Sequence, residues 1–256
     1  MNTNYQYIII STGGDRKKIT NELLNKVNTS KAPIYNLQAT TISDNDPFLD
    51  CIKDSFTEYE KKVVCCIKSH FRALEYASLF NSPEFTIILE DDVTFIKDNF
   101  SNIIDELINK LKNNSKYSNI GIFHIGYIID NSYDKFIESP PFEKLEIDNS
   151  YGFYNSFYAF GAQCYIIRKS ELQKQKIINL IHSRTFYKCH EIVSTYFNST
   201  HKIIGIDHII NRVFDFNLLY PPIVIERDEI STIGNNNKHF WEEYFNKFPE
   251  KKHNYL

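Results

Sequence analysis

Short apolar runs alternate with amphipathic segments along the first half of the chain. The apolar runs predict buried strands at residues 5–11, 32–42 and 85–89. Hydrophobic residues recur every three or four positions between 19 and 27 and again between 61 and 80, which is the period of an amphipathic helix. Residues 43–60 are polar and irregular and predict a loop that reaches over a site. Strands that alternate with helices in this way indicate an α/β domain.

The second half continues the alternation. Strands are predicted at residues 120–129, 164–167 and 218–225, and helices at 101–111, 170–181 and 204–214. The last strand contains Pro221 and Pro222, so we expect it to lie at a sheet edge or to end early. No internal repeat and no linker interrupts the pattern, which predicts a single domain over residues 1–256.

Composition narrows the class of protein. The 256 residues carry a net charge of -3, which argues against a general nucleic-acid binder, and an aromatic fraction of 15% argues against intrinsic disorder. The five cysteines are odd in number and lack CxxC spacing, a pattern that favours reduced thiols over a disulfide framework. The sequence contains no signal peptide and no apolar window long enough to span a membrane, so we expect a cytoplasmic protein with no transmembrane segment.

The most informative motif is a run of three carboxylates, Glu90, Asp91 and Asp92, directly after the strand at 85–89. Adjacent carboxylates at the end of a buried strand repel one another unless a cation lies among them. Mg²⁺ and Mn²⁺ favour such oxygen ligands and leave positions open for substrate phosphates. In open α/β sheets ligands bind at the carboxyl ends of strands, where this triplet falls. The alternative is a solvated turn, or a helix cap formed by Asp92 or Asp98.

The neighbours of this triplet resemble glycosyltransferase family 25, which includes lipooligosaccharide and collagen galactosyltransferases. Members typically show a Cys-x-x-Ser-His helix, a strand ending in Glu-Asp-Asp, a Gly-x-x-x-Tyr strand, a late Asp-His and a Pro-rich strand with a downstream Ser. The matching residues here are Cys66, Ser69, His70, Glu90, Asp91, Asp92, Gly161, Tyr165, Asp207, His208, Pro221, Pro222 and Ser231. The first strand departs from the family pattern, because Gly13 and Gly14 precede Asp15 and Arg16.

The resemblance implies a GT-A fold, in which one Rossmann-like mixed sheet flanked by helices binds a nucleotide-sugar. It also implies an inverting hexosyltransferase that uses Mn²⁺ or Mg²⁺, with UDP-galactose or UDP-glucose as the donor. The acceptor would be a glycan or a hydroxylysine-type protein hydroxyl. Residues 1–125 would form the nucleotide-sugar and metal half, and residues 126–256 the acceptor half.

The same resemblance suggests roles for the metal and donor residues. Asp92 is the expected direct metal ligand, with Glu90 completing the acidic edge and His239 as a late ligand. Asp91 completes that edge or turns toward the ribose or sugar of the donor. Thr12 and Arg16 are expected to contact the nucleotide, Arg16 as a counter-charge to phosphate.

Asp207 and the Ser69–His70 pair each have two interpretations. Asp207 is the candidate base that deprotonates the acceptor hydroxyl, and its alternative is a cap for the helix that begins near it. Ser69 and His70 are expected to hold the residues that line the donor pocket without contacting the donor themselves. The alternative for His70 is a buried, hydrogen-bonded core histidine. Adjacent helix residues point about 100° apart, so the two are not expected to act as a nucleophile and base.

Two other functions remain open. A metal-dependent phosphotransferase or nucleotidyltransferase would use the same triplet, although the sequence lacks a Walker motif and a kinase signature. A catalytically silent module that binds nucleotide-sugars or glycans would also retain the fold.

Overall fold

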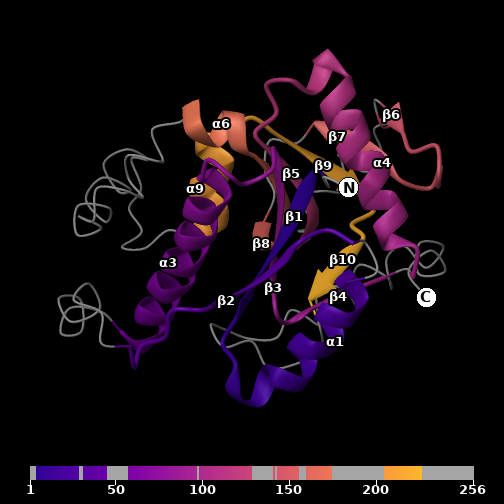
Figure 1. The fold of residues 1–256 in the computed structure, drawn as a ribbon. Helices are drawn as coiled ribbons and strands as arrows, with labels where there is room; N and C mark the ends of the chain where they lie inside the picture. The colour runs from indigo at the N-terminus through magenta and orange to yellow at the C-terminus, as the bar shows by residue number, and fades with distance from the viewer. Residues whose placement is uncertain are drawn as a thin grey trace.

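The structure is a computed structural model that describes residues 4–28, 31–44, 57–96, 98–128, 141, 143–155, 160–174 and 205–226. Within these residues it forms a ten-stranded mixed sheet with helices on both faces (Figure 1). The predicted fold class, a mixed α/β sheet flanked by helices in a single domain, is confirmed.

The sheet combines a parallel part with an antiparallel part. The strand order is β2–β1–β3–β8–β5–β9–β7–β6, and β10 pairs with β5 and β4 outside this path. Strand β1 is parallel to both β2 and β3, whereas β8 runs antiparallel between β3 and β5. The bounds are β1 (Tyr5–Ser11), β2 (Ile34–Gln38), β3 (Phe85–Glu90), β4 (Val93–Phe95), β5 (Ile122–Ile128), β6 (Glu143–Lys144), β7 (Gly152–Asn155), β8 (Phe160–Arg168), β9 (Phe216–Tyr220) and β10 (Val224–Glu226).

Helices cover each face of the sheet. Residues of α1 (Lys17–Val27) and α4 (Phe100–Asn113) belong to one hydrophobic core, and residues of α3 (Glu58–Ser78), α6 (Lys169–Lys174) and α9 (Ile206–Val213) belong to a second. In Figure 1 the two groups lie on opposite sides of the strands. Short 3₁₀ turns, η1 (Gly14–Arg16) and η3 (Ser115–Tyr117), precede α1 and follow α4.

Strand β1 shows why the sequence pattern produces this layered core. Successive side chains of a strand point to opposite faces. Tyr7 and Ile9 therefore contribute to the α1 and α4 side, and Ile8 and Ile10 to the α3 side. Every residue of β1 is buried, as expected for a central strand covered on both faces.

The predicted elements differ from the observed ones at their ends, and strands β4, β6 and β7 were not predicted. Helix α3 begins at Glu58 rather than at 61, because the Thr57 hydroxyl accepts from the Glu60 backbone N–H and the Glu60 carboxylate accepts in return from the Thr57 backbone N–H. The last residues of the predicted loop at 43–60 are therefore helical, and residues 45–56 lie outside the described part.

The predicted strand at 218–225 is two strands. Strand β9 ends at Tyr220 and β10 begins at Val224, so the Pro221–Pro222 pair does end the strand early. The edge position is wrong for β9, because β9 pairs with both β5 and β7.

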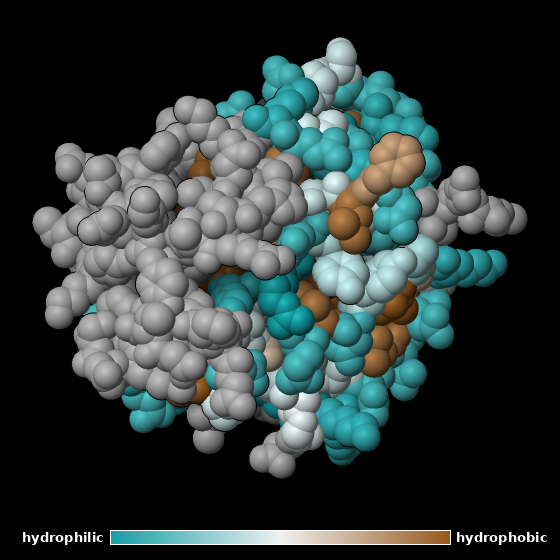
Figure 2. Space-filling view, turned by 60° about the vertical axis from the view of Figure 1, so that its left-hand side comes forward, coloured by the Kyte–Doolittle hydropathy of each residue, from teal (hydrophilic) through white to brown (hydrophobic). Residues whose placement is uncertain are grey.

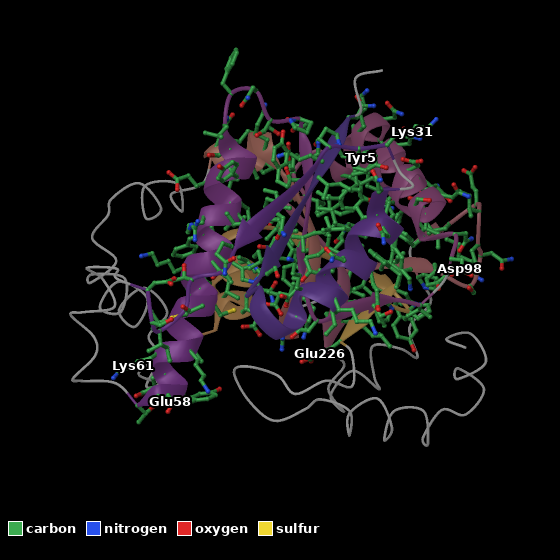
Figure 3. All side chains as sticks on the ribbon, turned by 60° about the horizontal axis from the view of Figure 1, so that its bottom comes forward. Tyr5, Lys31, Glu58, Lys61, Asp98 and Glu226 are labelled. Carbon is green, nitrogen blue, oxygen red and sulfur yellow. The ribbon has the colours of Figure 1, made fainter. Side chains whose placement is uncertain are left out.

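Side chains fill the space between the sheet and the helices (Figure 3). On the face shown in Figure 2, the described surface is mostly hydrophilic, with small hydrophobic areas. None of the helices in the described ranges is long and apolar enough to cross a membrane.

Candidate active site

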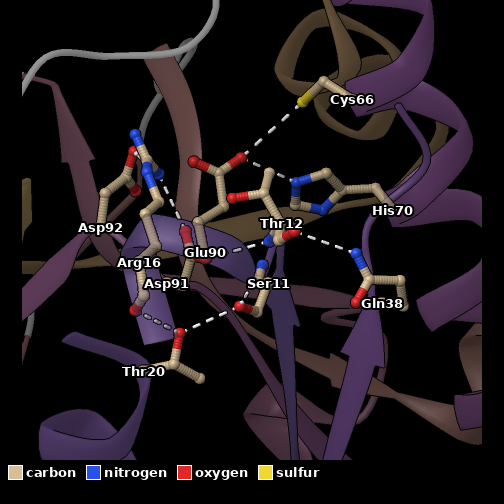
Figure 4. A network of polar contacts seen from close by, with 11 residues as sticks. Ser11, Thr12, Arg16, Thr20, Gln38, Cys66, His70, Glu90, Asp91 and Asp92 are labelled. Atoms are coloured by element: carbon tan, nitrogen blue, oxygen red, sulfur yellow. Dashed lines mark hydrogen bonds and ion pairs between the residues drawn. The ribbon is translucent and has the colours of Figure 1, made fainter. Parts of the chain in front are cut away.

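The candidate site lies at the carboxyl ends of β1, β2 and β3. Ser11 pairs with Gln38 of β2, and Ile10 pairs with Glu90 of β3, so the three parallel strands end at the same edge of the sheet. The loop after β1 and the acidic triplet after β3 are therefore neighbours. Figure 4 shows the polar contacts that join them.

The two glycines that depart from the family pattern shape this loop. Gly13 has a φ of 69° and Gly14 a φ of 57°, backbone conformations that glycine adopts without steric cost. The backbone N–H of Thr12 donates to Asp91 Oδ2 at 3.0 Å, and the backbone N–H of Arg16 donates to Gly13 O at 3.1 Å. This turn places both Thr12 and Arg16 beside the triplet.

Arg16 joins the second and third carboxylates. Its Nη1 lies 2.8 Å from Asp91 Oδ1 and 3.0 Å from Asp92 Oδ2. Burial lowers the pKa of Arg16, but hydrogen bonds and charges from the two aspartates outweigh that effect and raise it. The guanidinium group therefore remains charged and partly neutralises the triplet.

Asp92 retains one carboxylate oxygen without a partner. The residue is 8% exposed, and its Oδ1 is buried and accepts no hydrogen bond within the described structure. Burial, followed by the charge of Glu90, raises the pKa of Asp92 to about 7, against the opposing effect of Arg16. The charge of Glu226 at the end of β10, labelled in Figure 3, adds to this shift. A buried carboxylate oxygen in excess negative charge is a suitable ligand for a hard divalent cation.

Glu90 turns away from Asp92 toward helix α3 (Figure 4). Its Oε1 lies 2.9 Å from His70 Nε2 and 3.7 Å from Cys66 Sγ. Burial would raise the pKa of Glu90, but the hydrogen bond from His70 and the charge of His70 lower it overall. Burial and the charge of Glu90 raise the pKa of the Cys66 thiol well above its usual value. The three carboxylates thus have three different environments.

Ser69 and His70 bind different groups, as their positions on a helix require. His70 is fully buried, and its Nδ1 lies 3.0 Å from the Tyr165 hydroxyl of β8. Ser69 Oγ accepts from the backbone N–H of Thr40 at 2.8 Å and donates to Cys65 O at 2.8 Å. Ser69 therefore fixes the segment after β2 against α3, while His70 holds Glu90.

Asp207 is the second residue of α9. The N-cap of this helix is Gly205, so Asp207 is not the cap residue, and the capping alternative is wrong. Asp207 Oδ2 instead accepts from the backbone N–H of Gly161 at 3.0 Å. Its charge also contributes to the raised pKa of Cys66.

The helix-cap alternative for the triplet is wrong as well. Helix α4 is capped by Asn99, and Asp92 lies in the turn between β3 and β4. His239 lies outside the described residues.

Several contacts of the site were not predicted from the sequence. The contact of Cys66 with Glu90 could have been expected once His70 was placed beside Glu90. Cys66 and His70 are four residues apart on a helix, so their side chains lie on the same face. The contacts of Tyr165 with His70 and of Gly161 with Asp207 join residues far apart in the chain. No pattern in the local sequence predicts contacts between such residues.

Comparison with known proteins adds remote similarities of fold. No model of a known protein family matches the sequence, and no curated protein matches it. One similar solved structure is a glycosyltransferase involved in glycosylation of the major capsid of PBCV-1. It has 13% identity and a TM-score of 0.42, over 91% of this chain and 99% of that chain. The galactosyltransferase LgtC in complex with donor and acceptor sugar analogues has 10% identity and a TM-score of 0.41, over 94% of each chain.

A third similar structure is the 4-diphosphocytidyl-2C-methyl-D-erythritol synthase of Anaerococcus prevotii. It has 14% identity and a TM-score of 0.37, over 94% of this chain and 98% of that chain. At TM-scores below 0.5, the functional argument rests on the residues of the site.

Proposed function

We propose that this protein is a glycosyltransferase of the GT-A type, similar to family 25, that transfers a hexose from a UDP-sugar to a hydroxyl acceptor. The proposed donor is UDP-galactose or UDP-glucose, and the proposed acceptor is a glycan or a hydroxylysine-type protein hydroxyl. The reaction would invert the configuration at the sugar carbon and depend on Mn²⁺ or Mg²⁺. Residues 1–125 would supply most of the donor and metal site, and residues 126–256 most of the acceptor site.

The unpartnered Oδ1 of Asp92 is the observation that carries this proposal. Two further carboxylates, Glu90 and Asp91, lie at the end of β3 beside it, and Arg16 contacts Asp91 and Asp92. The remaining negative charge would repel the diphosphate of a nucleotide-sugar. A divalent cation held by Asp92, with Glu90 and the remote His239 as further candidates, would stabilise the charge that develops on the leaving diphosphate.

The other residues at this edge would organise donor binding. Arg16 holds Asp91 and Asp92 in fixed positions, and the Thr12 N–H holds the second oxygen of Asp91. Asp91 is the proposed acceptor of hydrogen bonds from the ribose or the sugar of the donor. His70 fixes Glu90, and Ser69 fixes the end of β2 beside them.

Asp207 is the proposed base that removes the proton of the acceptor hydroxyl. Gly161 holds its Oδ2, so the carboxylate is oriented before the acceptor binds. We expect Asp207→Asn to reduce transfer at least a hundredfold and to leave donor binding unchanged, since the amide oxygen can still accept from Gly161. Transfer rate and UDP-sugar affinity, measured separately, test this role. Equal loss of both, or full activity, would contradict it.

The first experiment is release of UDP from a panel of UDP-sugars with Mn²⁺, with Mg²⁺ and with excess chelator. We expect slow hydrolysis of one donor that stops in chelator, and the same loss in Asp92→Ala. The exposed Asp98 is a matched control, and Asp98→Ala should keep the activity. Release of pyrophosphate from a nucleoside triphosphate plus a sugar phosphate would support a nucleotidyltransferase instead. Tight donor binding without turnover over any acceptor would support a silent binding module.

A further inference from the structure

We propose that Cys66, His70 and Glu90 form a separate binding site for a thiophilic divalent cation, with Zn²⁺ as the best fit. The proposal concerns the side of the triplet away from Asp92 and does not require glycosyltransferase activity, although it assigns Glu90 to this cation rather than to the one at Asp92. One ligand atom from each of these residues, Cys66 Sγ, a ring nitrogen of His70 and a carboxylate oxygen of Glu90, lies within 4.8 Å of the other two.

The fold brings the three ligands together from two rigid elements. Cys66 and His70 lie four residues apart on α3, so both side chains emerge from the same face of the helix. Glu90 is the last residue of β3 and extends from the sheet toward that face (Figure 4). The placement therefore depends on helix and strand backbone rather than on a loop.

The distances are close to those of a zinc site. Zinc bonds of about 2.0–2.3 Å in a tetrahedral arrangement separate a nitrogen and an oxygen ligand by about 3.4 Å, and a sulfur and an oxygen ligand by about 3.6 Å. The corresponding separations here are 2.9 Å for His70 Nε2 to Glu90 Oε1 and 3.7 Å for Cys66 Sγ to the same oxygen. A sulfur and a nitrogen ligand of such a site lie about 3.6 Å apart. Cys66 Sγ and the ring nitrogen of His70 lie within 4.8 Å of each other, so binding requires side-chain movements of up to about 1 Å.

The chemistry of the donor set separates this site from the one proposed at Asp92. A thiolate, an imidazole and a carboxylate suit Zn²⁺, whereas Mg²⁺ and Mn²⁺ favour oxygen ligands. Three protein ligands leave a fourth tetrahedral position for water or another group. On binding, the thiol proton of Cys66 is released to solvent and the ring proton of His70 moves from Nε2 to Nδ1, so one proton leaves the site for each cation that binds.

Tyr165 completes the site behind His70. When Nε2 carries the proton and donates to Glu90, Nδ1 accepts from the Tyr165 hydroxyl at 3.0 Å. When a metal occupies Nε2, Nδ1 carries the proton and donates to the same hydroxyl, because a hydroxyl group both donates and accepts. A partner of this kind orients the ligating histidine in metal sites.

Co²⁺ is the probe for this site, because a thiolate ligand gives Co²⁺ an intense charge-transfer absorption. The full chain, stripped of metal with a chelator and kept reduced with a phosphine, is titrated with Co²⁺ and then with Zn²⁺. We expect the absorption to saturate at one equivalent of Co²⁺ and to disappear when Zn²⁺ displaces it. Absence of the absorption in the wild-type chain would overturn the proposal.

One variant and two controls test Cys66 as a ligand. Cys66→Ser should abolish the absorption and weaken Zn²⁺ binding at least tenfold. Cys65→Ser changes the adjacent buried cysteine, which is outside the cluster, and should keep both. Asp92→Asn should also keep both, which distinguishes this site from the one at Asp92. Loss of the absorption in Cys65→Ser, or its persistence in Cys66→Ser, would contradict the assignment.

A second measurement needs no variant. We expect Zn²⁺ to protect Cys66 of the wild-type chain from alkylation by iodoacetamide, as followed by mass spectrometry of the modified peptides. Equal alkylation of Cys66 with and without Zn²⁺ would count against the site even if all variants folded poorly.

Discussion

Asp92 has a pKa well above that of an ordinary aspartate, and this has a consequence for stability. Burial raises its pKa to about 7 from an ordinary value near 3.8. Between these values the folded chain holds a proton that the unfolded chain has lost, so the contribution of Asp92 to the free energy of unfolding falls as pH rises. An asparagine carries no charge and lacks this effect.

We therefore expect Asp92→Asn, in excess chelator, to raise the free energy of unfolding more at pH 8 than at pH 5.5, by about 2 kcal/mol. Urea unfolding of both proteins at the two pH values measures the difference. Asp98→Asn, at an exposed position, should show no comparable difference. A gain that is the same at both pH values would show that Asp92 is already ionised at pH 5.5 in the folded chain.

Arg16 favours the ionised forms of Asp91 and Asp92, because its positive charge contacts both carboxylates. Its side chain is 12% exposed and contacts both Asp91 and Asp92. Removal of one partner from a largely buried ion pair leaves uncompensated charge, so Arg16→Gln should lower the free energy of unfolding by on the order of 3 kcal/mol at pH 8. Lys18→Gln, on the exposed surface of α1, is the control and should change it by less than about 0.5 kcal/mol. Similar values for the two variants would refute the bridging role of Arg16.

At the scale of residues, the sequence identified the acidic triplet and the loop beside it. It did not predict which side chains each of the three carboxylates contacts. The position of Glu90, Asp91 and Asp92 after a strand follows from local pattern alone. That Glu90 faces Cys66 and His70 while Asp91 and Asp92 face Arg16 depends on the packing of α3 and η1 against the strand ends. The side-chain directions at the end of a strand are set by these distant neighbours.

At the scale of elements, strand β5 requires a glycine at position 126, where strands β8 and β10 lie too close for a side chain. A Cβ on Gly126 would lie 2.8 Å from Val224 Cβ, 2.9 Å from Cys164 Cβ and 3.0 Å from Val224 O. These are atoms of β10 and β8 that cannot rotate away. Gly126→Ala should therefore lower the free energy of unfolding by about 1–3 kcal/mol, as for other overpacked sites. Denaturant unfolding tests this, with the exposed Ser118→Ala as a control that should have little effect. An unchanged or higher stability would mean that β10 moves freely relative to β5.

Strand pairing was the part of the element structure that the sequence could not supply. The periodicity predicts β1, β3 and β5 nearly as they are, because a buried strand has a local signature. It does not predict that β8 lies between β3 and β5, or that the segment after Pro222 leaves β9 to pair with β4 and β5. Such pairings depend on contacts between residues far apart in the chain.

At the scale of the whole molecule, the two proposed halves share one sheet. Strand β8 contributes to the antiparallel pairs on both of its sides, with Phe85–Leu89 of β3 and with β5. The second core likewise combines Phe71 and Leu74 of α3 with Ile209 and Ile210 of α9. A donor half and an acceptor half are therefore divisions of the site and not units that fold separately.

This arrangement predicts that a fragment of residues 1–128, which keeps β5 intact, does not fold cooperatively. It loses β8 from the middle of the sheet and α9 from the second core, so both β3 and β5 would expose an unpaired edge and an uncovered face. We expect no sharp urea transition by circular dichroism for this fragment, a single transition for the full chain, and partial recovery when the fragment is mixed with residues 141–256. A sharp transition of the 1–128 fragment at the urea concentration that unfolds the full chain would show instead that the first half is stable without β8.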